Sequence, residues 1–314
     1  MDSNLAAEDL GVQSINTDSV AASPLKTALK KLSRNKLAIG CLVILLLEIL
    51  MVLMAPMLSR YSPEDADVRI RLAPGIWALL DKSSPDAAAY VHGHFLGTDY
   101  LGRDMFSRLL WGGRVSLTVG FFSTSMGFVI GVILGLLAGY YPKLDNPIMR
   151  VMDLLFTFPS ILLAILIVAM LGVSLFNTML AISIWSIPNF ARMTRGKVLQ
   201  IKEEDYILAV RSIGAGGARI IFAHVLHNCL PIIIVIATMR MATSIISIAT
   251  LSYLGMGVPP PTPEWGGLIA SARPYMWDRP SLIILPGIAV TITVICFNIL
   301  GDKLRDILDP SLKD

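Results

Sequence analysis

Residues 115–141 read VSLTVGFFSTSMGFVIGVILGLLAGYY, an apolar stretch without a single charged side chain. A helix needs about 20 predominantly apolar residues to cross the hydrocarbon core of a bilayer. Further stretches of mainly apolar character lie at residues 37–59, 150–173, 176–192, 226–256 and 281–301. The sequence therefore predicts an all-α, polytopic membrane protein with six transmembrane helices.

Small residues recur at every fourth position of this decisive stretch: Ser123, Gly127, Gly131, Gly135 and Gly139. Residues at that spacing share one face of a helix and let another helix backbone approach closely. The stripe indicates either a tightly packed helix within the fold or, more specifically, a contact at the centre of a transport bundle whose helices slide.

The composition supports a membrane protein. Apolar residues make up 54% of the chain, charged residues 16%, and the net charge is +3, so nothing points to nucleic acid. The first apolar segment could be mistaken for a signal peptide, but its polar lead of residues 1–36 is long and no A-x-A site follows. We interpret it as an uncleaved anchor. Cys41, Cys229 and Cys296 lie in predicted membrane segments and read as small packing residues.

The distribution of Lys and Arg predicts the orientation, because cytoplasmic flanks carry an excess of both. The first segment is preceded by Lys26, Lys30, Lys31, Arg34 and Lys36. This predicts a cytoplasmic tail at 1–36, an extracytoplasmic loop at 60–114, a five-helix core at 115–301 with a cytoplasmic loop at 193–225, and a cytoplasmic tail at 302–314. The arginines of the outer loop run against the rule, but acidic residues balance them. Met105, Leu109, Leu110 and Trp111 have the spacing of a helix on the outer membrane surface.

The cytoplasmic loop has the pattern of a short amphipathic helix. Asp205 is an acid at the expected N-terminus, where the helix dipole favours it, and Tyr206, Val210 and Ile213 recur at helical spacing. Gly214 is placed to end the helix, after which a second helix runs into the fifth segment. Such a helix either lies flat on the inner membrane surface or fills the groove of a partner with its apolar face.

The string DYILAVRSIGA at residues 205–215 resembles the EAA loop of ABC importer permeases, in particular the C-type permeases of dipeptide, oligopeptide and nickel importers. Other motifs of that family follow in order from about Leu96 to the end of the chain. They are Leu96-Gly97-Thr98-Asp99, Gly102-Arg103-Asp104, Ser107-Arg108-Leu109-Leu110, Met149-Arg150 with Asp153, Phe158-Pro159, residues 251–257, Pro259-Pro260, Pro263-Glu264-Trp265-Gly266, residues 297–302 and Leu304-Arg305-Asp306.

Residues 238–240 and 243–247, together with 186–188 and 190–192, are most similar to permeases of the glutathione type. The chain also departs from the family. Leu208 and Val210 stand where Glu and Ala are usual, and His227 stands where Pro is common. The missing Glu puts one polar contact to an ATPase in doubt, while the Gly214 turn and the helical spacing remain.

The resemblance implies a type I ABC importer permease fold and a multi-pass protein of the bacterial plasma (inner) membrane with both termini in the cytoplasm. It also implies peptide import, of dipeptides, oligopeptides or glutathione, with nickel or another small solute as the alternative. The implied partners are a homologous second permease, two cytoplasmic ATPases, an extracytoplasmic substrate-binding protein and the lipid bilayer. The residues that it assigns to ATPase coupling are Asp205, Tyr206, Ala209, Val210, Arg211, Ile213, Gly214 and Ala215.

Nothing in the sequence points to a nucleotide site in this chain. Its Gly196-Lys197 pair lacks the preceding Gly and following Ser or Thr of G-x-x-x-x-G-K-[ST]. We therefore expect a non-catalytic subunit that binds no cofactor, with ATP and Mg²⁺ on partner chains. A stand-alone channel would not need the docking loop, and an intramembrane hydrolase would need a nucleophile and base that the sequence does not assemble.

Ionisable residues in membrane segments are candidate functional residues because their insertion is costly. Arg240 lies mid-segment and is either a structurally paired arginine or a cation lining the path for a peptide carboxylate; Ser244 lies one turn on. Asp153 fits an ion pair with Arg150 better than a substrate role. Glu48 is expected to be buried against a partner helix. Arg240, Ser244 and Asp153 are thus the candidate residues of the translocation path.

The four histidines do not predict a metal site. His92 and His94 are two residues apart, and His224 and His227 are three apart. Neither pair has a third ligand nearby in sequence, so we expect solvated or hydrogen-bonding imidazoles.

Overall fold

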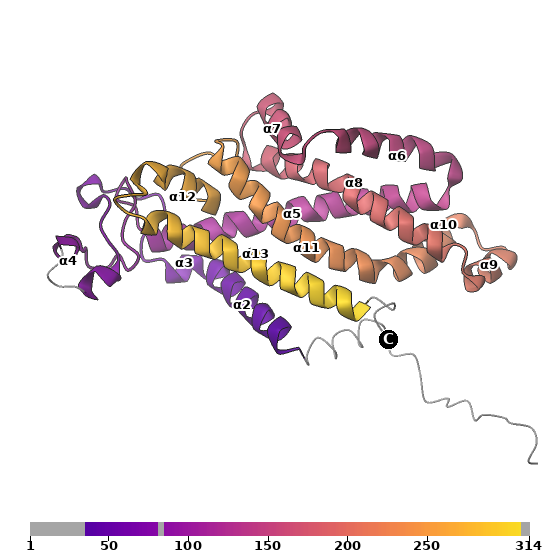
Figure 1. The fold of residues 1–314 in the computed structure, drawn as a ribbon, viewed down its shortest axis with the longest axis horizontal. Helices are drawn as coiled ribbons and strands as arrows, with labels where there is room; N and C mark the ends of the chain where they lie inside the picture. The colour runs from indigo at the N-terminus through magenta and orange to yellow at the C-terminus, as the bar shows by residue number, and fades with distance from the viewer. Residues whose placement is uncertain (1–34, 81–84, 309–314) are drawn as a thin grey trace, which may run out of the picture.

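The computed structural model describes residues 35–80 and 85–308, and the regular secondary structure of these residues is entirely helical (Figure 1). The predicted all-α fold is confirmed. Most of the predicted cytoplasmic tails, residues 1–34 and 309–314, lies outside the described residues.

The N-terminal helix α2 spans Lys36–Leu53 and is followed by the short α3, Ala55–Leu58. Asn35 starts α2, because its Oδ1 accepts hydrogen bonds from the backbone N–H of Leu37 at 3.1 Å and of Ala38 at 3.2 Å. An irregular segment then leads to α5 and contains η1 (Val68–Ile70), η2 (Ile76–Leu80) and α4 (Pro85–Ala89).

Helix α5 runs without interruption over Met105–Tyr140. The expectation of a separate surface helix over residues 105–111 is therefore wrong, since these residues form the first turns of α5. Gly112 and Gly113 lie within this helix, and Trp265 packs against them. A Cβ added at Gly113 would lie 2.7 Å from Trp265 Cζ2 and 2.8 Å from Val52 Cγ2. These glycines allow close packing within a helix and do not end one.

The predicted third span is not one straight helix. It consists of α6 (Pro142–Thr157) and α7 (Ser160–Leu171), whose axes differ by 92°. The break falls at Phe158, which has an extended backbone with ψ of 134°. Pro159 explains it, because the residue before a proline is pushed out of the helical region.

The helices α8 and α13 are longer than the apolar segments that predicted them. α8 spans Leu175–Ile201, and α11 spans Leu226–Tyr253 as the continuation of α10 (Gly217–Arg219) and η3 (Ile220–Val225). Between them lies α9, Asp205–Ser212. The chain ends with α12 (Trp265–Ala272), η4 (Arg273–Tyr275) and α13 (Ser281–Leu308).

The long helices α2, α5, α8, α11 and α13 run along the long axis of the molecule (Figure 1). α9 lies at one end, here called the α9 end, and α12 lies with the segment before α5 at the other, here called the α12 end (Figure 1). Among the described residues, four helices are long and apolar enough to cross a membrane, or up to five with the bent pair. α8 is not among them, because polar residues such as Asn177, Asn189 and Arg192 lower its mean hydropathy. The predicted count of six is not confirmed.

Candidate functional site

α9 ends as the sequence predicts, at a glycine turn. Gly214 adopts φ of +86°, the left-handed region that favours glycine. Its N–H donates to the Arg211 carbonyl at 3.0 Å, and the Ala215 N–H donates to the Val210 carbonyl at 3.3 Å. These bonds satisfy carbonyls that the last turn of the helix leaves open. The helix thus stops sharply, and the chain turns back toward η3.

α9 turns one face toward the core of its own chain. Ile207 is fully buried and the half-buried Val210 packs beside it. Their cluster includes Ile201 at the end of α8 and Ile220 and Ile221 in η3. Val210 therefore packs partly against the chain's own core, which its spacing from Tyr206 and Ile213 did not indicate, and its coupling role stays a prediction. The reason is tertiary: the ends of α8 and η3 occupy that side of α9.

Three large side chains of the α9 segment are nevertheless exposed, and they are largely apolar. The exposed fractions are 42% for Tyr206, 42% for Leu208 and 84% for Ile213. We call Tyr206, Leu208 and Ile213 the coupling face. Leu208 occupies the position where permeases of this kind usually have Glu, so here an exposed apolar side chain replaces a charged one. Among the other predicted coupling residues, Asp205, Ala209, Arg211 and Gly214 are exposed and Ala215 is half-buried.

Tyr206 is the member of the coupling face that is tied to the long helices. Asn228 of α11 donates a hydrogen bond from Nδ2 to Tyr206 Oη at 2.8 Å. Burial, and then the nearby Glu204 carboxylate, raises the pKa of Tyr206 above its usual range. The hydroxyl therefore stays protonated at neutral pH and joins the start of α9 to α11. Arg211 lies over the Tyr140 ring at 5.9 Å, which links α9 to the end of α5 as well.

The small-residue stripe of α5 lies against α8. A Cβ added at Gly131 would lie 2.6 Å from Phe190 Cβ and 2.7 Å from the Ile187 carbonyl oxygen, and one at Gly135 would lie 2.5 Å from the Ala191 carbonyl oxygen. Gly127 and Gly139 meet α8 in the same way, at Ser186 and Val198 respectively. The two helix backbones can lie this close only because the side chains are absent.

Arg240 lies half-buried in α11 and meets α8. Its Nη2 donates to Asn189 Oδ1 at 2.8 Å, and its guanidinium carbon lies 5.7 Å from the centre of the Trp185 ring. No carboxylate among the described residues forms an ion pair with it. Asn189 and Trp185 escape sequence analysis, because a neutral amide and a tryptophan carry no charge signal and Asn189 is 51 positions away.

A hydroxyl-bearing cavity lies farther along α11. It measures about 270 Å³ and is lined by Trp185, by Ser160 of α7 and by Thr243, Ser247 and Thr250 of α11. With Arg240, the three α11 residues are spaced by three or four positions and so share one helix face. A cation, an indole and several hydroxyls thus lie along one face of α11.

The other two residues predicted for the translocation path lie elsewhere. Ser244 is buried between helices, with its hydroxyl 3.0 Å from Thr124 Oγ1 of α5. Asp153 pairs with Arg192 of α8, whose Nη2 lies 2.6 Å from Asp153 Oδ1, and not with Arg150. The expected Arg150 pair is therefore wrong, because the nearer cation comes from α8. Ser244 and Asp153 do not line the cavity.

Glu48 is partly buried against α13, within this chain, where Thr293 Oγ1 donates to its Oε1 at 2.6 Å.

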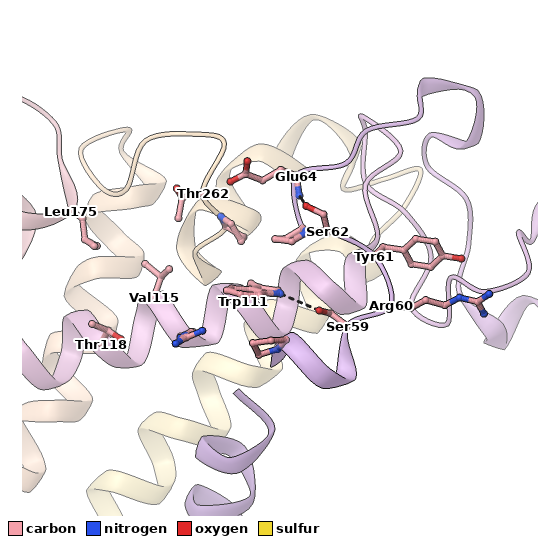
Figure 2. Close-up of a pocket in the computed structure, with 14 residues that line it drawn as sticks. Ser59, Arg60, Tyr61, Ser62, Glu64, Trp111, Val115, Thr118, Leu175 and Thr262 are labelled. Atoms are coloured by element: carbon pink, nitrogen blue, oxygen red, sulfur yellow. Dashed lines mark hydrogen bonds between the residues drawn. The ribbon is translucent and has the colours of Figure 1, made fainter. Parts of the chain in front are cut away.

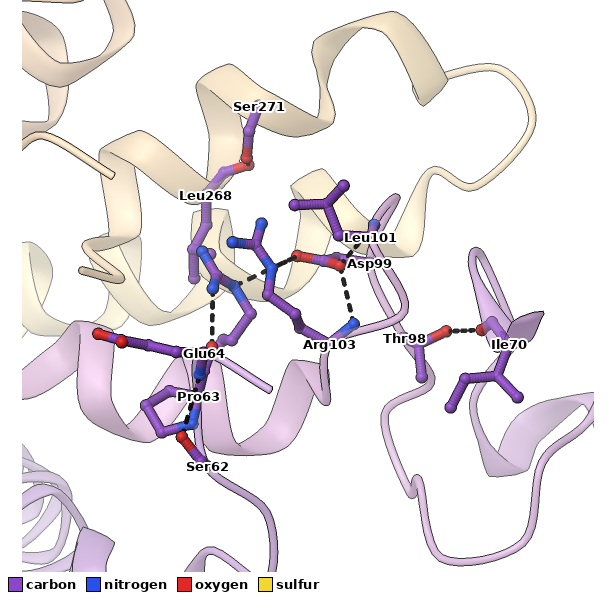
Figure 3. Close-up of polar contacts among 11 residues, drawn as sticks. Ser62, Pro63, Glu64, Ile70, Thr98, Asp99, Leu101, Arg103, Leu268 and Ser271 are labelled. Atoms are coloured by element: carbon purple, nitrogen blue, oxygen red, sulfur yellow. Dashed lines mark hydrogen bonds and ion pairs between the residues drawn. The ribbon is translucent and has the colours of Figure 1, made fainter. Parts of the chain in front are cut away.

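The α12 end holds a cluster of buried charges (Figure 3). Arg103 Nε lies 2.7 Å and Arg108 Nε 3.4 Å from Asp99 Oδ2. Arg108 also donates to the Pro63 carbonyl at 2.8 Å.

Two further acids and a histidine are buried at the α12 end, each with hydrogen-bond partners. His94 Nδ1 lies 2.8 Å from Asp104 Oδ1, so His94 is a hydrogen-bonding residue, as expected. The fully buried Glu264 accepts hydrogen bonds from Ser116 and from the N–H groups of Gly266 and Gly267. No group of three metal-ligating side chains occurs among the described residues. These contacts fix the loop before α5 and the start of α12 to the helix bundle.

Comparisons with known proteins agree with this geometry. Residues 127–314 match the binding-protein-dependent transport system inner membrane component family, and residues 23–74 match the N-terminal TM domain of oligopeptide transport permease C. The chain is 42% identical to the dipeptide transport system permease protein DppC of Alkalihalophilus pseudofirmus, over 93% of this chain and 92% of that protein.

A second relative is the glutathione transport system permease protein GsiD of Pectobacterium atrosepticum. It is 43% identical and the match covers 94% of each chain. Among solved structures, the inward-facing MetNI methionine ABC transporter superposes with a TM-score of 0.54 at 22% identity, over 65% of this chain and 97% of that one. This likeness confirms the predicted permease fold. The chain belongs to the family of binding-protein-dependent transport system inner membrane components.

Proposed function

We propose that this chain is one of two homologous permeases of an ATP-driven importer for peptides. The observation that carries the proposal is the coupling face, three exposed and largely apolar side chains on a helix held at the ends of α5, α8 and α11. The relatives named for dipeptide and glutathione transport support peptides as the substrate class.

The proposed assembly contains two cytoplasmic ATPases, which carry ATP and Mg²⁺, and an extracytoplasmic substrate-binding protein. In this assembly the α9 end and both chain termini lie on the cytoplasmic side of the bacterial membrane. The α12 end lies on the outer side. The lysines and arginines before α2 support this orientation. This chain performs no chemistry itself.

The packing of α9 gives a route for coupling. Ile207 shares one buried cluster with Ile201 of α8 and Val225 of η3. When the ATPases close on ATP and push the coupling face, α9 cannot move without displacing the ends of both helices. Close-packed elements respond by switching between discrete arrangements, which is how a small displacement becomes a change of access.

The polar face of α11 would form this chain's side of the path. A peptide carries a carboxylate, for which the Arg240 guanidinium supplies two N–H donors in a fixed fork. With no acid paired to it among the described residues, Arg240 retains its attraction for an anion. Thr243, Ser247 and Thr250 supply hydroxyls without strong binding, which suits a solute that must also leave.

The test is purification of the complex through this chain, identification of its subunits by mass spectrometry, and reconstitution into liposomes with ATP inside or outside. We expect two ATPases, a second permease and ATP-dependent uptake of a labelled dipeptide when the binding protein is present. Uptake of Ni²⁺ in place of every peptide tested would contradict the substrate class, and uptake without any ATPase would contradict the importer.

A further inference from the structure

A larger cavity lies at the α12 end, away from α9 and from the polar face of α11. Its volume is about 730 Å³, within the range of small-molecule sites. Its walls come from the segment after α3, from α5 and from the loop before α12 (Figure 2). Figure 2 shows Glu64 and Thr262 across the cavity from Val115 and Thr118.

Three charged residues line this cavity, Arg60, Glu64 and Arg114, and none forms an ion pair within the described parts of the chain. Arg114 is exposed and forms no hydrogen bond or ion pair within the described parts of the chain, its one contact being with the Trp111 ring at 5.5 Å. The exposed Glu64 carboxylate likewise forms no ion pair there, and its charge acts at longer range on the buried Arg108. By contrast, Asp99 and Arg103 at the same end of the molecule are paired at short distance.

The wall between these charges is held rigidly. Trp111 Nε1 donates a hydrogen bond to Ser59 Oγ at 3.1 Å, which fixes the indole as part of the cavity wall (Figure 2). Arg114 stacks on that indole. A cation held against a fixed aromatic ring loses less conformational freedom when it binds an anion, so the site is partly preorganised.

We propose that this cavity is an outer binding site for a zwitterionic peptide. Arg114 receives the terminal carboxylate, Glu64 receives the terminal ammonium, and Trp111 and Val115 contact the peptide side chains. The site rests on the proposed peptide import and adds to it a contact made before the peptide reaches the polar face of α11.

A phosphatidylethanolamine headgroup carries the same pair of charges. The peptide fits better, because Ser62, Glu64 and Thr262 lie in loops and leave a polar rim. The cavity also has apolar walls, from Trp111, Val115 and Leu175, against which an acyl chain could pack. The lipid is therefore an outcome that the test must separate.

The test uses the assembled importer in nanodiscs of phosphatidylglycerol and phosphatidylcholine, without the binding protein. Calorimetry measures the affinity of three ligands: Ala-Phe, its C-terminal amide and its N-acetyl form. Each ligand is titrated into wild type, Arg114→Gln and Glu64→Gln. We expect Arg114→Gln to lower the affinity for Ala-Phe about tenfold, because a charge-assisted hydrogen bond to the carboxylate is lost. The amide lacks that carboxylate, so its already weak binding should not change. Glu64→Gln should show the same pattern with the N-acetyl form.

Arg60→Gln is the matched control. Arg60 also lines the cavity, but Figure 2 shows its side chain extending away from Trp111 and Val115, so Ala-Phe binding should not change. Equal weakening by Arg60→Gln, no binding of Ala-Phe to wild type, or displacement of Ala-Phe by added phosphatidylethanolamine would each overturn the proposal. Dipeptide uptake by wild type in liposomes with the binding protein, measured separately, keeps the proposed function standing in those cases, whereas its absence would reject that function.

Discussion

Ile207 and Ile213 lie at the two ends of one short helical segment in opposite surroundings: Ile207 is fully buried and Ile213 is 84% exposed. The first ties α9 to the ends of α8 and η3, and the second projects away from the chain. An exposed isoleucine on a tightly held helix is suited to contact another protein. In the assembly proposed above, that protein is an ATPase.

Ile213→Asp should uncouple ATP hydrolysis from uptake while leaving the amount of protein in the membrane unchanged. A charge placed in an apolar groove loses its hydration without gaining a partner. The measurement is dipeptide uptake and ATPase activity in proteoliposomes. Ile76→Asp is the matched control, because Ile76 is 48% exposed and lies at the α12 end, in η2. Normal uptake by Ile213→Asp would reject the docking role of α9.

Ile207→Ala should act differently, by destabilising the α9 end. Removing a fully buried isoleucine side chain costs about 2–5 kcal/mol. We expect a lower midpoint of thermal unfolding in detergent, together with reduced uptake. If the midpoint stays at the wild-type value, Ile207 does not anchor α9 in the core.

Gly131→Leu should impair folding or assembly even though it makes α5 more apolar. Its new side chain would meet Phe190 and the Ile187 carbonyl of α8, and overpacking of a tight contact costs about 1–3 kcal/mol or more. Gly40→Leu in α2 is the control, since a Cβ there would have nothing within 4 Å. Size-exclusion profiles of the two variants compare them directly, and a wild-type profile for Gly131→Leu would show that the α5–α8 contact can open.

Arg240→Gln should lower peptide uptake without lowering the protein level. Glutamine can keep a hydrogen bond to Asn189 but loses the charge that attracts a carboxylate. Arg240→Lys should retain part of the uptake, because charge is needed more than fork geometry. Uptake measured at matched expression decides: if Arg240→Gln equals wild type, the residue has a structural role only.

Asp99→Asn should destabilise the α12 end strongly. It would leave Arg103 and Arg108 buried beside each other without their shared carboxylate, and breaking a buried ion pair costs about 3–5 kcal/mol. Thermal unfolding in detergent measures the loss. Asp67→Asn removes an exposed pair with Arg69 and should have no measurable effect. Equal midpoints for the two variants would contradict the structural role of Asp99.

The sequence predicts the helical class, the α9 turn at Gly214 and the small-residue stripe, because each depends on spacing within one short segment. It does not predict the break at Pro159, since apolar residues continue on both sides and an average over the segment hides it. Nor does it tell which face of α9 is buried, because an eight-residue helix takes its orientation from the helices it meets. The Asn189 partner of Arg240 is set in the same way, by the packing of α8 on α11.

The right-angle bend between α6 and α7 has a consequence for the surrounding lipid. With 12 residues and a rise of about 1.5 Å each, α7 is roughly 18 Å long, against about 30 Å of hydrocarbon in a typical bilayer. α7 alone is therefore too short to span the hydrocarbon core. The rest of the apolar surface on this flank comes from α6, whose Val151, Leu154 and Phe156 are exposed.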